Sequence, residues 1–150
     1  MIECRTANPD DLAAVARLRQ RMAEEMGGDW DIAHPGWRTR YMQYFAGRQA
    51  SGRTQVFVAV DDGKVVGSAI VGTIEDYRAY ALNLVSAHIN AVYVLPSHRR
   101  RGIARRLMEL AVGWARAKGC IRVRLRASDE GRHLYESLGF HTGREMELTL

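Results

Sequence analysis

The middle of the chain combines a β-hairpin pattern with strands that are joined through helices. Residues 55–60 and 65–71 are rich in valine, and the turn Asp61-Asp62-Gly63-Lys64 connects them. A further strand is predicted at 89–94, and the segment after it has the spacing of a long amphipathic helix. Strands that pair locally and are later joined through helices predict a mixed sheet with helices on both of its faces.

The remaining elements complete an α/β order around this sheet. Asn8 caps the first helix, Pro9 and two acids occupy its first turn, and apolar residues at helical spacing extend it to Gly27. The chain shows no internal repeat, low-complexity tract or linker, so residues 1–150 are expected to form a single domain. The predicted order is β-α-α-β-β-β-α-β-α-β, with strands at 2–5, 55–60, 65–71, 89–94, 120–126 and 144–150 and helices at 8–27, 37–50, 102–118 and 130–138.

Composition and charge exclude several classes of protein. No run approaches the roughly 18 consecutive apolar residues of a membrane span. Glu3 and Arg5 stand where a signal peptide would need an apolar run, which favours a cytoplasmic location. The two cysteines suggest no disulfide, and the five histidines have no metal-ligand spacing, so no metal is expected. The net charge of +5 suits an anionic ligand.

Residues 92–104 are typical of an anion-binding turn between a strand and a helix. The strand ends at Pro96, a basic turn follows, and the helix begins at Gly102. The basic turn contains Arg99, Arg100 and Arg101. The first N–H groups of a helix lack internal partners and carry partial positive charge, and the small Ala104 keeps the approach of an anion open. The pattern predicts a phosphate site, whereas three arginines alone would fit a solvated basic turn equally well.

A second motif, at residues 127–140, lies just beyond the next predicted strand. Leu134 and Leu138 have the spacing of inward-facing helical residues, and Gly139 ends the helix. Tyr135 on this helix has two interpretations. It is either a core residue or a proton donor, since a phenol with a reference pKa of about 10 keeps its proton at neutral pH.

Together the two motifs resemble the signatures of the GNAT family of N-acetyltransferases. Arg99-x-x-Gly102-x-Ala104 is similar to the family's R/Q-x-x-G-x-G/A motif, and Leu-Tyr-Glu-Ser-Leu-Gly-Phe, which ends at Phe140, is similar to the second one. The resemblance is strong over residues 65–140. It implies a mixed, mostly antiparallel sheet and an enzyme that transfers an acetyl group from acetyl-CoA to a primary amine.

The resemblance also implies roles for the matched residues. Tyr135 would be the general acid that protonates the CoA thiolate. The strand before the loop would part from its neighbour and bind pantetheine through its backbone, and the loop and helix start would bind the pyrophosphate. The residues expected to bind acetyl-CoA are Val92, Tyr93, Val94, Arg99, Arg100, Arg101, Gly102, Ile103, Ala104, Arg105 and Ser128.

Two positions depart from the family pattern. Ser128 stands where many relatives have an asparagine, although its hydroxyl can still form a hydrogen bond to the CoA arm. Val123 stands where some relatives have a glutamate base. The general base must therefore lie elsewhere or be a chain of water molecules.

The acceptor itself is not identified by the sequence. By resemblance, residues 24–31 and 75–80 would line the acceptor side of the cleft, with His88 and Asn90 as further candidates. Acidic and aromatic residues in both segments would favour a cationic amine, and ordinary solvated loops are the alternative interpretation.

Two other functions remain open at this stage. The arginines of residues 99–106, together with Arg116 and those at every second position of 122–126, could form a nucleic-acid surface. Acids are mixed among them, Glu109 can pair with Arg105, and no nucleic-acid motif is present, so this function is not favoured. The second alternative is a CoA sensor without catalytic activity, against which Tyr135 argues.

A homodimer is expected from the last predicted strand, 144–150. Its apolar residues alternate with polar ones, and an edge strand exposes unpaired N–H and C=O groups. GNAT-type proteins frequently cover such an edge with a second copy. The alternative is that this strand is inserted beside residues 120–126 and shielded within one chain.

Overall fold

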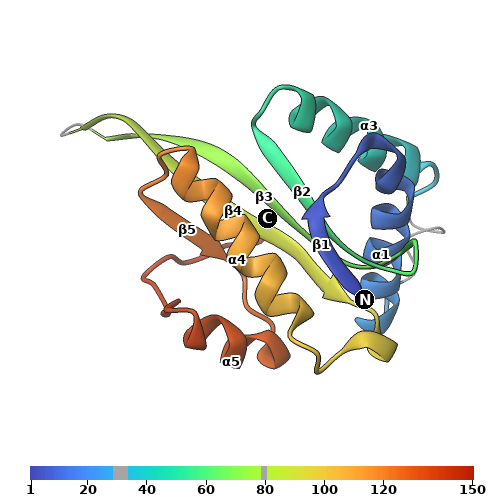
Figure 1. The fold of residues 1–150 in the computed structure, drawn as a ribbon. Helices are drawn as coiled ribbons and strands as arrows, with labels where there is room; N and C mark the ends of the chain where they lie inside the picture. The colour runs from blue at the N-terminus through green and yellow to red at the C-terminus, as the bar shows by residue number, and fades with distance from the viewer. Residues whose placement is uncertain (29–33, 79–80) are drawn as a thin grey trace.

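A five-stranded sheet forms the centre of the molecule in a computed structural model that describes residues 1–28, 34–78 and 81–150 (Figure 1). Its strands lie in the order β1-β2-β3-β4-β5, and neighbours are antiparallel except β4 and β5, which are parallel. A helical connection between β4 and β5 makes this parallel pairing possible. The strands are β1 (Ile2–Thr6), β2 (Thr54–Asp61), β3 (Lys64–Arg78), β4 (Ala81–Val94) and β5 (Arg122–Leu125).

Helices cover both faces of this sheet, as predicted. Figure 1 shows α1 (Leu12–Glu25) and α3 (Trp37–Ala50) on one face and α4 (Ile103–Ala117) on the other, with α5 (Asp129–Ser137) beside α4. Short 3-10 helices, Pro9–Asp11 and Pro96–His98, precede α1 and α4. None of the described helices is long and apolar enough to cross a membrane.

Each face of the sheet has its own hydrophobic core. The α4-side core is formed by buried residues of α4, α5 and the strands, including Phe57, Val71, Ile89, Leu107, Met108 and Tyr135. The α1-side core contains Leu12, Val15, Val56, Val58 and Ile70. The two cores pack the helices of each face against the sheet.

The hairpin between β2 and β3 is confirmed. Asp62 and Gly63 both have positive φ, 47° and 75°, which is the conformation that a two-residue hairpin turn requires. β3 and β4 are longer than predicted, since they continue to Arg78 and begin at Ala81. The sequence pattern missed these ends because they pair mainly with each other.

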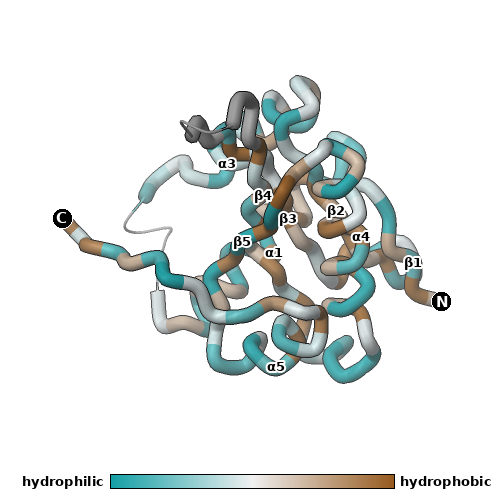
Figure 2. Tube along the Cα trace, turned by 90° about the vertical axis from the view of Figure 1, so that its left-hand side faces the viewer, coloured by the Kyte–Doolittle hydropathy of each residue, from teal (hydrophilic) through white to brown (hydrophobic). Residues whose placement is uncertain are grey.

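The strand predicted at 144–150 is wrong. Residues 141–150, here called the tail, contain no helix or strand, and Figure 2 shows the tail extending away from the body of the molecule. Met146 and Leu148 are 94% and 82% exposed, so the alternation of apolar residues is not matched by a buried face. A cavity of about 1110 Å³ opens between the tail, β5 and α5. The tail therefore contacts β5 through side chains and not through backbone pairing.

Candidate active site

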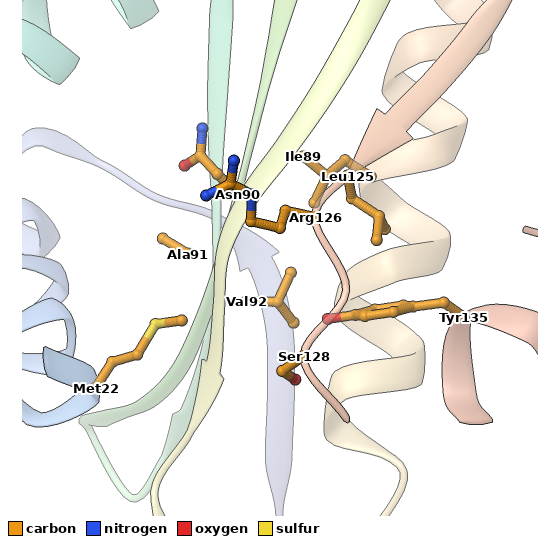
Figure 3. Close-up of a pocket in the computed structure, with 9 residues that line it drawn as sticks. All are labelled: Met22, Ile89, Asn90, Ala91, Val92, Leu125, Arg126, Ser128 and Tyr135. Atoms are coloured by element: carbon orange, nitrogen blue, oxygen red, sulfur yellow. The ribbon is translucent and has the colours of Figure 1, made fainter. Parts of the chain in front are cut away.

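β4 and β5 pair over only four residues and then separate. Residues 86–89 of β4 face residues 122–125 of β5. β4 then continues to Val94, whereas the segment that follows β5 turns toward α5. No described strand pairs with this edge of β4 beyond Ile89, so its backbone groups can bind an extended ligand. The separation contains a cavity of about 70 Å³ (Figure 3). It is lined by Met22, Ile89, Asn90, Ala91, Val92, Leu125, Arg126, Ser128 and Tyr135.

A β-bulge in β4 lies at this separation. The register with β3 shifts between Ser68 and Ile70, so that Ala91 and Val92 together face one residue of β3. Ala91 has φ of 53°, a left-handed conformation that costs a residue other than glycine about 1 kcal/mol. Both residues line the cavity, and Val92 packs against the α4-side core whereas Ala91 packs against the α1-side core. No glycine marks the bulge in the sequence, so the hydrophobic pattern did not predict it.

Tyr135 extends from α5 with its hydroxyl group in the cavity. α5 begins after Ser128, whose Oγ accepts a hydrogen bond from Gly131 N–H at 3.1 Å. Tyr135 is 9% exposed, and its ring packs edge-on against Phe140. Figure 3 shows the hydroxyl pointing toward Val92 and Ser128. Burial raises the pKa of Tyr135 above its ordinary value, so the hydroxyl is protonated at neutral pH.

The loop before α4 offers backbone N–H groups to an anion. Gly102 and Arg100 both have left-handed conformations, with φ of 75° and 65°. The N–H of Arg106 donates to the carbonyl of Gly102 at 3.1 Å, so the N–H groups of residues 103–105 have no partner within the helix. A Cβ at Gly102 would meet no atom within 4 Å, which leaves the approach to these groups open. This geometry suits a phosphate.

The side chain of Arg99 turns away from this loop and toward α1. Its Nε donates to the Val94 carbonyl at 2.9 Å, and its terminal nitrogen lies 3.0 Å from Glu25. The hydroxyl of Tyr93 donates to the same carboxylate, and the Arg99 guanidinium lies over the Tyr93 ring. The hydrogen bond from Tyr93 lowers the pKa of Glu25, and burial raises the pKa of Tyr93 to about 12. Glu25, which the sequence suggested only for the acceptor side, thus connects α1 to the loop.

The other residues predicted to bind acetyl-CoA are divided between the surface and the core. Arg100 and Arg101 are exposed on the loop. Arg105 donates to Ser137 Oγ at 2.6 Å and so connects α4 to α5. The side chains of Val94 and Ile103 are buried, and that of Ala104 packs against the same core. The structure therefore brings Val92, Ser128 and Tyr135 to the cavity, whereas residues 100–105 lie in the loop and the first turn of α4.

The residues predicted for the acceptor side are only partly described. Residues 29–31 and 79–80 lie outside the described residues, as do the side chains of 76–78. Glu24 accepts a hydrogen bond from Gln20 at 3.0 Å. Asn90 lines the cavity, whereas His88 is half-buried, and burial lowers its pKa. Val123, which stands at the position of the family's glutamate, packs against the α4-side core.

Comparison with known proteins gives the same classification as the two motifs. The model of the Acetyltransferase (GNAT) family matches residues 15–140. An aminoglycoside N(6')-acetyltransferase type 1 of Salmonella typhimurium is 30% identical over 87 residues, which are 56% of this chain and 60% of that protein. A glucosamine 6-phosphate N-acetyltransferase of Trypanosoma brucei brucei is 34% identical over 104 residues, which are 69% of each. The matched part thus spans less than two thirds of the aminoglycoside relative.

The fold also agrees with that of a solved structure. A crystal structure of a predicted acetyltransferase with acetyl-CoA from Clostridium acetobutylicum superimposes with a TM-score of 0.86, covering 99% of this chain and 96% of that one. The two sequences are 22% identical, so this likeness concerns the fold alone. The family model matches most of the chain, and the trypanosomal relative exceeds 30% identity over more than two thirds of it, so the chain belongs to the GNAT family of acetyltransferases.

Proposed function

We propose that this chain transfers an acetyl group from acetyl-CoA to a primary amine, with Tyr135 as the general acid. The observation that carries the proposal is the position of the Tyr135 hydroxyl in the cavity where β4 and β5 separate. Membership of the family and similarity to two N-acetyltransferases support the type of reaction.

In this proposal acetyl-CoA would bind along one path from the loop before α4 to the cavity. The N–H groups of residues 103–105 and the charges of Arg100 and Arg101 would bind the pyrophosphate. The unpaired edge of β4 would accept the pantetheine arm in the manner of an added strand. The path ends at the cavity, where the thioester would lie beside Tyr135.

The reaction requires the chain to position an amine and to supply a proton to sulfur. As the nitrogen forms a bond to the acetyl carbon, the carbon–sulfur bond breaks and the Tyr135 hydroxyl donates its proton to the departing sulfur. The proton that leaves the nitrogen returns through water to the phenolate, so the tyrosine is restored. An amide and a free thiol are the products, with no net gain or loss of protons.

The amine must reach the thioester in its neutral form. No carboxylate or imidazole occurs among the described residues that line the cavity. Water is therefore the group that we assign to carry the proton away from the nitrogen. This assignment agrees with Val123 at the position of the family's glutamate.

The experiment that tests the proposal measures free CoA thiol released from acetyl-CoA with a panel of amines. Release that depends on both substrates is expected. Calorimetry with acetyl-CoA in parallel separates the alternatives: binding without release for any amine would favour the catalytically silent CoA sensor, and no binding would contradict the whole assignment.

We also propose that the protein is a homodimer, with the exposed apolar residues of the tail covered by a second copy. Met146, Leu148 and Leu150 support this proposal, because exposed apolar side chains that lie close together are typical of an interaction surface. The cytoplasmic location stays a prediction from the sequence.

A further inference from the structure

One face of β5 and the residue after it carry arginines at every second position. Val123 and Leu125 pack against the α4-side core. Successive residues of a strand point to opposite faces, so the alternating arginines lie on the face toward α1 and α3. These residues are Arg122, Arg124 and Arg126. His88 of β4 pairs in register with Arg124, so the positive face continues the open side of β4.

Arg126 brings this positive charge to the cavity of Tyr135. Both side chains line the cavity, and Arg126 is the only charged residue among the described ones that do so. Figure 3 shows the Arg126 side chain reaching toward Asn90 and the Tyr135 hydroxyl pointing toward Val92 and Ser128. A small molecule that presents its amine beside Tyr135 would therefore lie within reach of Arg126.

Two carboxylates of the tail already occupy this positive face. Glu145 Oε1 lies 3.7 Å from a terminal nitrogen of Arg124, and the carboxylate of Glu147 forms an ion pair with Arg126. The two glutamates are 75% and 62% exposed, and the tail has no strand pairing. Exposed ion pairs contribute only about 0–1 kcal/mol, so another anion can replace them.

Two of the acids that were expected to attract a cationic amine, Glu24 and Glu25, form hydrogen bonds within the chain. The carboxylate of Glu25 binds Arg99 and Tyr93, and that of Glu24 accepts from Gln20. The charge that the described lining of the cavity presents to an acceptor is that of Arg126, and it is positive.

We propose that the acceptor amine carries an anionic group, a carboxylate or a phosphate, which binds Arg124 and Arg126 in the places held by Glu145 and Glu147. The inference rests on the proposed acetyltransferase function. Guanidinium groups bind carboxylates and phosphates through paired, charge-assisted hydrogen bonds. Between the acceptors that the two relatives are named for, a phosphorylated amino sugar matches this face, whereas an aminoglycoside, which is a polyamine, would be repelled by it.

The test compares acceptors with and without an anionic group. Glucosamine 6-phosphate is compared with glucosamine, glycine with glycinamide, and an aminoglycoside serves as the cationic acceptor. We expect the KM of one anionic member to be at least about tenfold below that of its neutral counterpart, since a hydrogen bond to a charged group contributes that much. The pair that shows the difference tells a phosphate from a carboxylate.

Variants of the arginines connect that preference to this face. Arg124→Gln/Arg126→Gln should raise the KM for the anionic amine about tenfold or more and leave the affinity for acetyl-CoA unchanged. Arg116→Gln is the matched control, because Arg116 is exposed on α4 and its loss lowers the net charge away from the cavity. Glu145→Gln/Glu147→Gln should lower the KM for the anionic amine two- to threefold, roughly the value of an exposed ion pair.

Three results would overturn the inference while leaving the proposed function intact. The first is turnover that prefers neutral or cationic amines. The second is a preference for the anionic amine that persists in Arg124→Gln/Arg126→Gln. The third is a KM for the anionic amine that Glu145→Gln/Glu147→Gln leaves unchanged. If no amine releases CoA, the proposed function fails. The anion site is then judged by calorimetry with glucosamine 6-phosphate and with inorganic phosphate: binding that the arginine variant abolishes supports it, and any other result refutes it.

Discussion

Gly131 and Tyr135 lie one helical turn apart and in such close contact that no side chain fits between them. A Cβ at Gly131 would be 2.7 Å from Cε2 of the tyrosine ring and 3.0 Å from its hydroxyl oxygen. Both distances are shorter than van der Waals contact. The Tyr135 ring can therefore occupy its position only because residue 131 has no side chain. The glycine in the first turn of α5 thus determines where the hydroxyl of the proposed proton donor lies.

Gly131→Ala should displace the Tyr135 ring and lower kcat. The overlap should also reduce the free energy of unfolding by about 1–3 kcal/mol, in spite of the better helix propensity of alanine. Gly113→Ala is the control, because Gly113 lies within α4 and a Cβ there meets no atom within 4 Å. That variant should gain up to about 1 kcal/mol and keep its kcat. Thermal melts and initial rates measure both, and equal behaviour of the two variants would contradict the contact.

Tyr135→Phe should lower kcat on the order of 10²-fold and leave the Kd for acetyl-CoA unchanged. The ring and its contact with Phe140 remain, and only the proton that would be transferred to sulfur is removed. Steady-state rates give kcat and calorimetry gives Kd. Turnover at the rate of the unchanged protein would leave Tyr135 with a purely structural role.

The pH dependence of kcat should reflect the same proton. A general acid works only while it is protonated, and burial raises the pKa of Tyr135, so activity should persist to a higher pH than a free phenol would allow. The basic limb of the profile is expected above about pH 10. Rates measured from neutral pH upward, with unfolding followed in parallel, check this, and a limb well below pH 10 would assign the acid to another group.

Arg100→Gly should have opposite effects on stability and on ligand binding. Arg100 holds a left-handed conformation, and glycine adopts it without strain. Release of that strain should exceed the entropic cost of glycine in the unfolded chain, for a net gain of about 0.5–1 kcal/mol. The lost charge should weaken acetyl-CoA binding several-fold at low salt and less at high salt.

Arg101→Gly provides the control for this pair of effects. It removes the same charge from the same loop, but Arg101 has no positive φ, so glycine there should lower the free energy of unfolding. Melting temperatures and calorimetric titrations at two salt concentrations compare the variants. If both variants change the free energy of unfolding in the same direction, the backbone strain assigned to Arg100 is refuted.

Local patterns were sufficient for the parts of the fold that local forces decide. The hairpin follows from Asp62 and Gly63, and α4 follows from its apolar spacing and from Gly102 at its start. The bulge at Ala91 could not be predicted, because the fit of β4 between β3 and two helical layers imposes it on an ordinary residue. The turn of Arg99 toward Glu25 depends on a partner 74 residues earlier, which no local pattern indicates.

In the tail, by contrast, a clear local pattern predicted a strand that the structure does not contain. Alternating apolar residues form a strand only where one face is buried and an open edge lies within reach. β5 extends for four residues, and a large cavity separates it from the tail. Met146 and Leu148 are left in solvent, beside the edge of β5 that pairs with no described strand. A second copy of the chain can supply the missing cover.

The proposed homodimer should therefore depend on the apolar residues of the tail. Light scattering at micromolar concentration should give twice the chain mass, and Met146→Ser/Leu148→Ser should move the mass toward the monomer at the same concentration, because those side chains would lose the apolar contact they gain between copies. Met26→Ser is the control: Met26 is also exposed, at 76%, but follows α1 and not the tail. A monomer mass that is independent of concentration, or an equal loss of mass in the control, would refute the role of the tail.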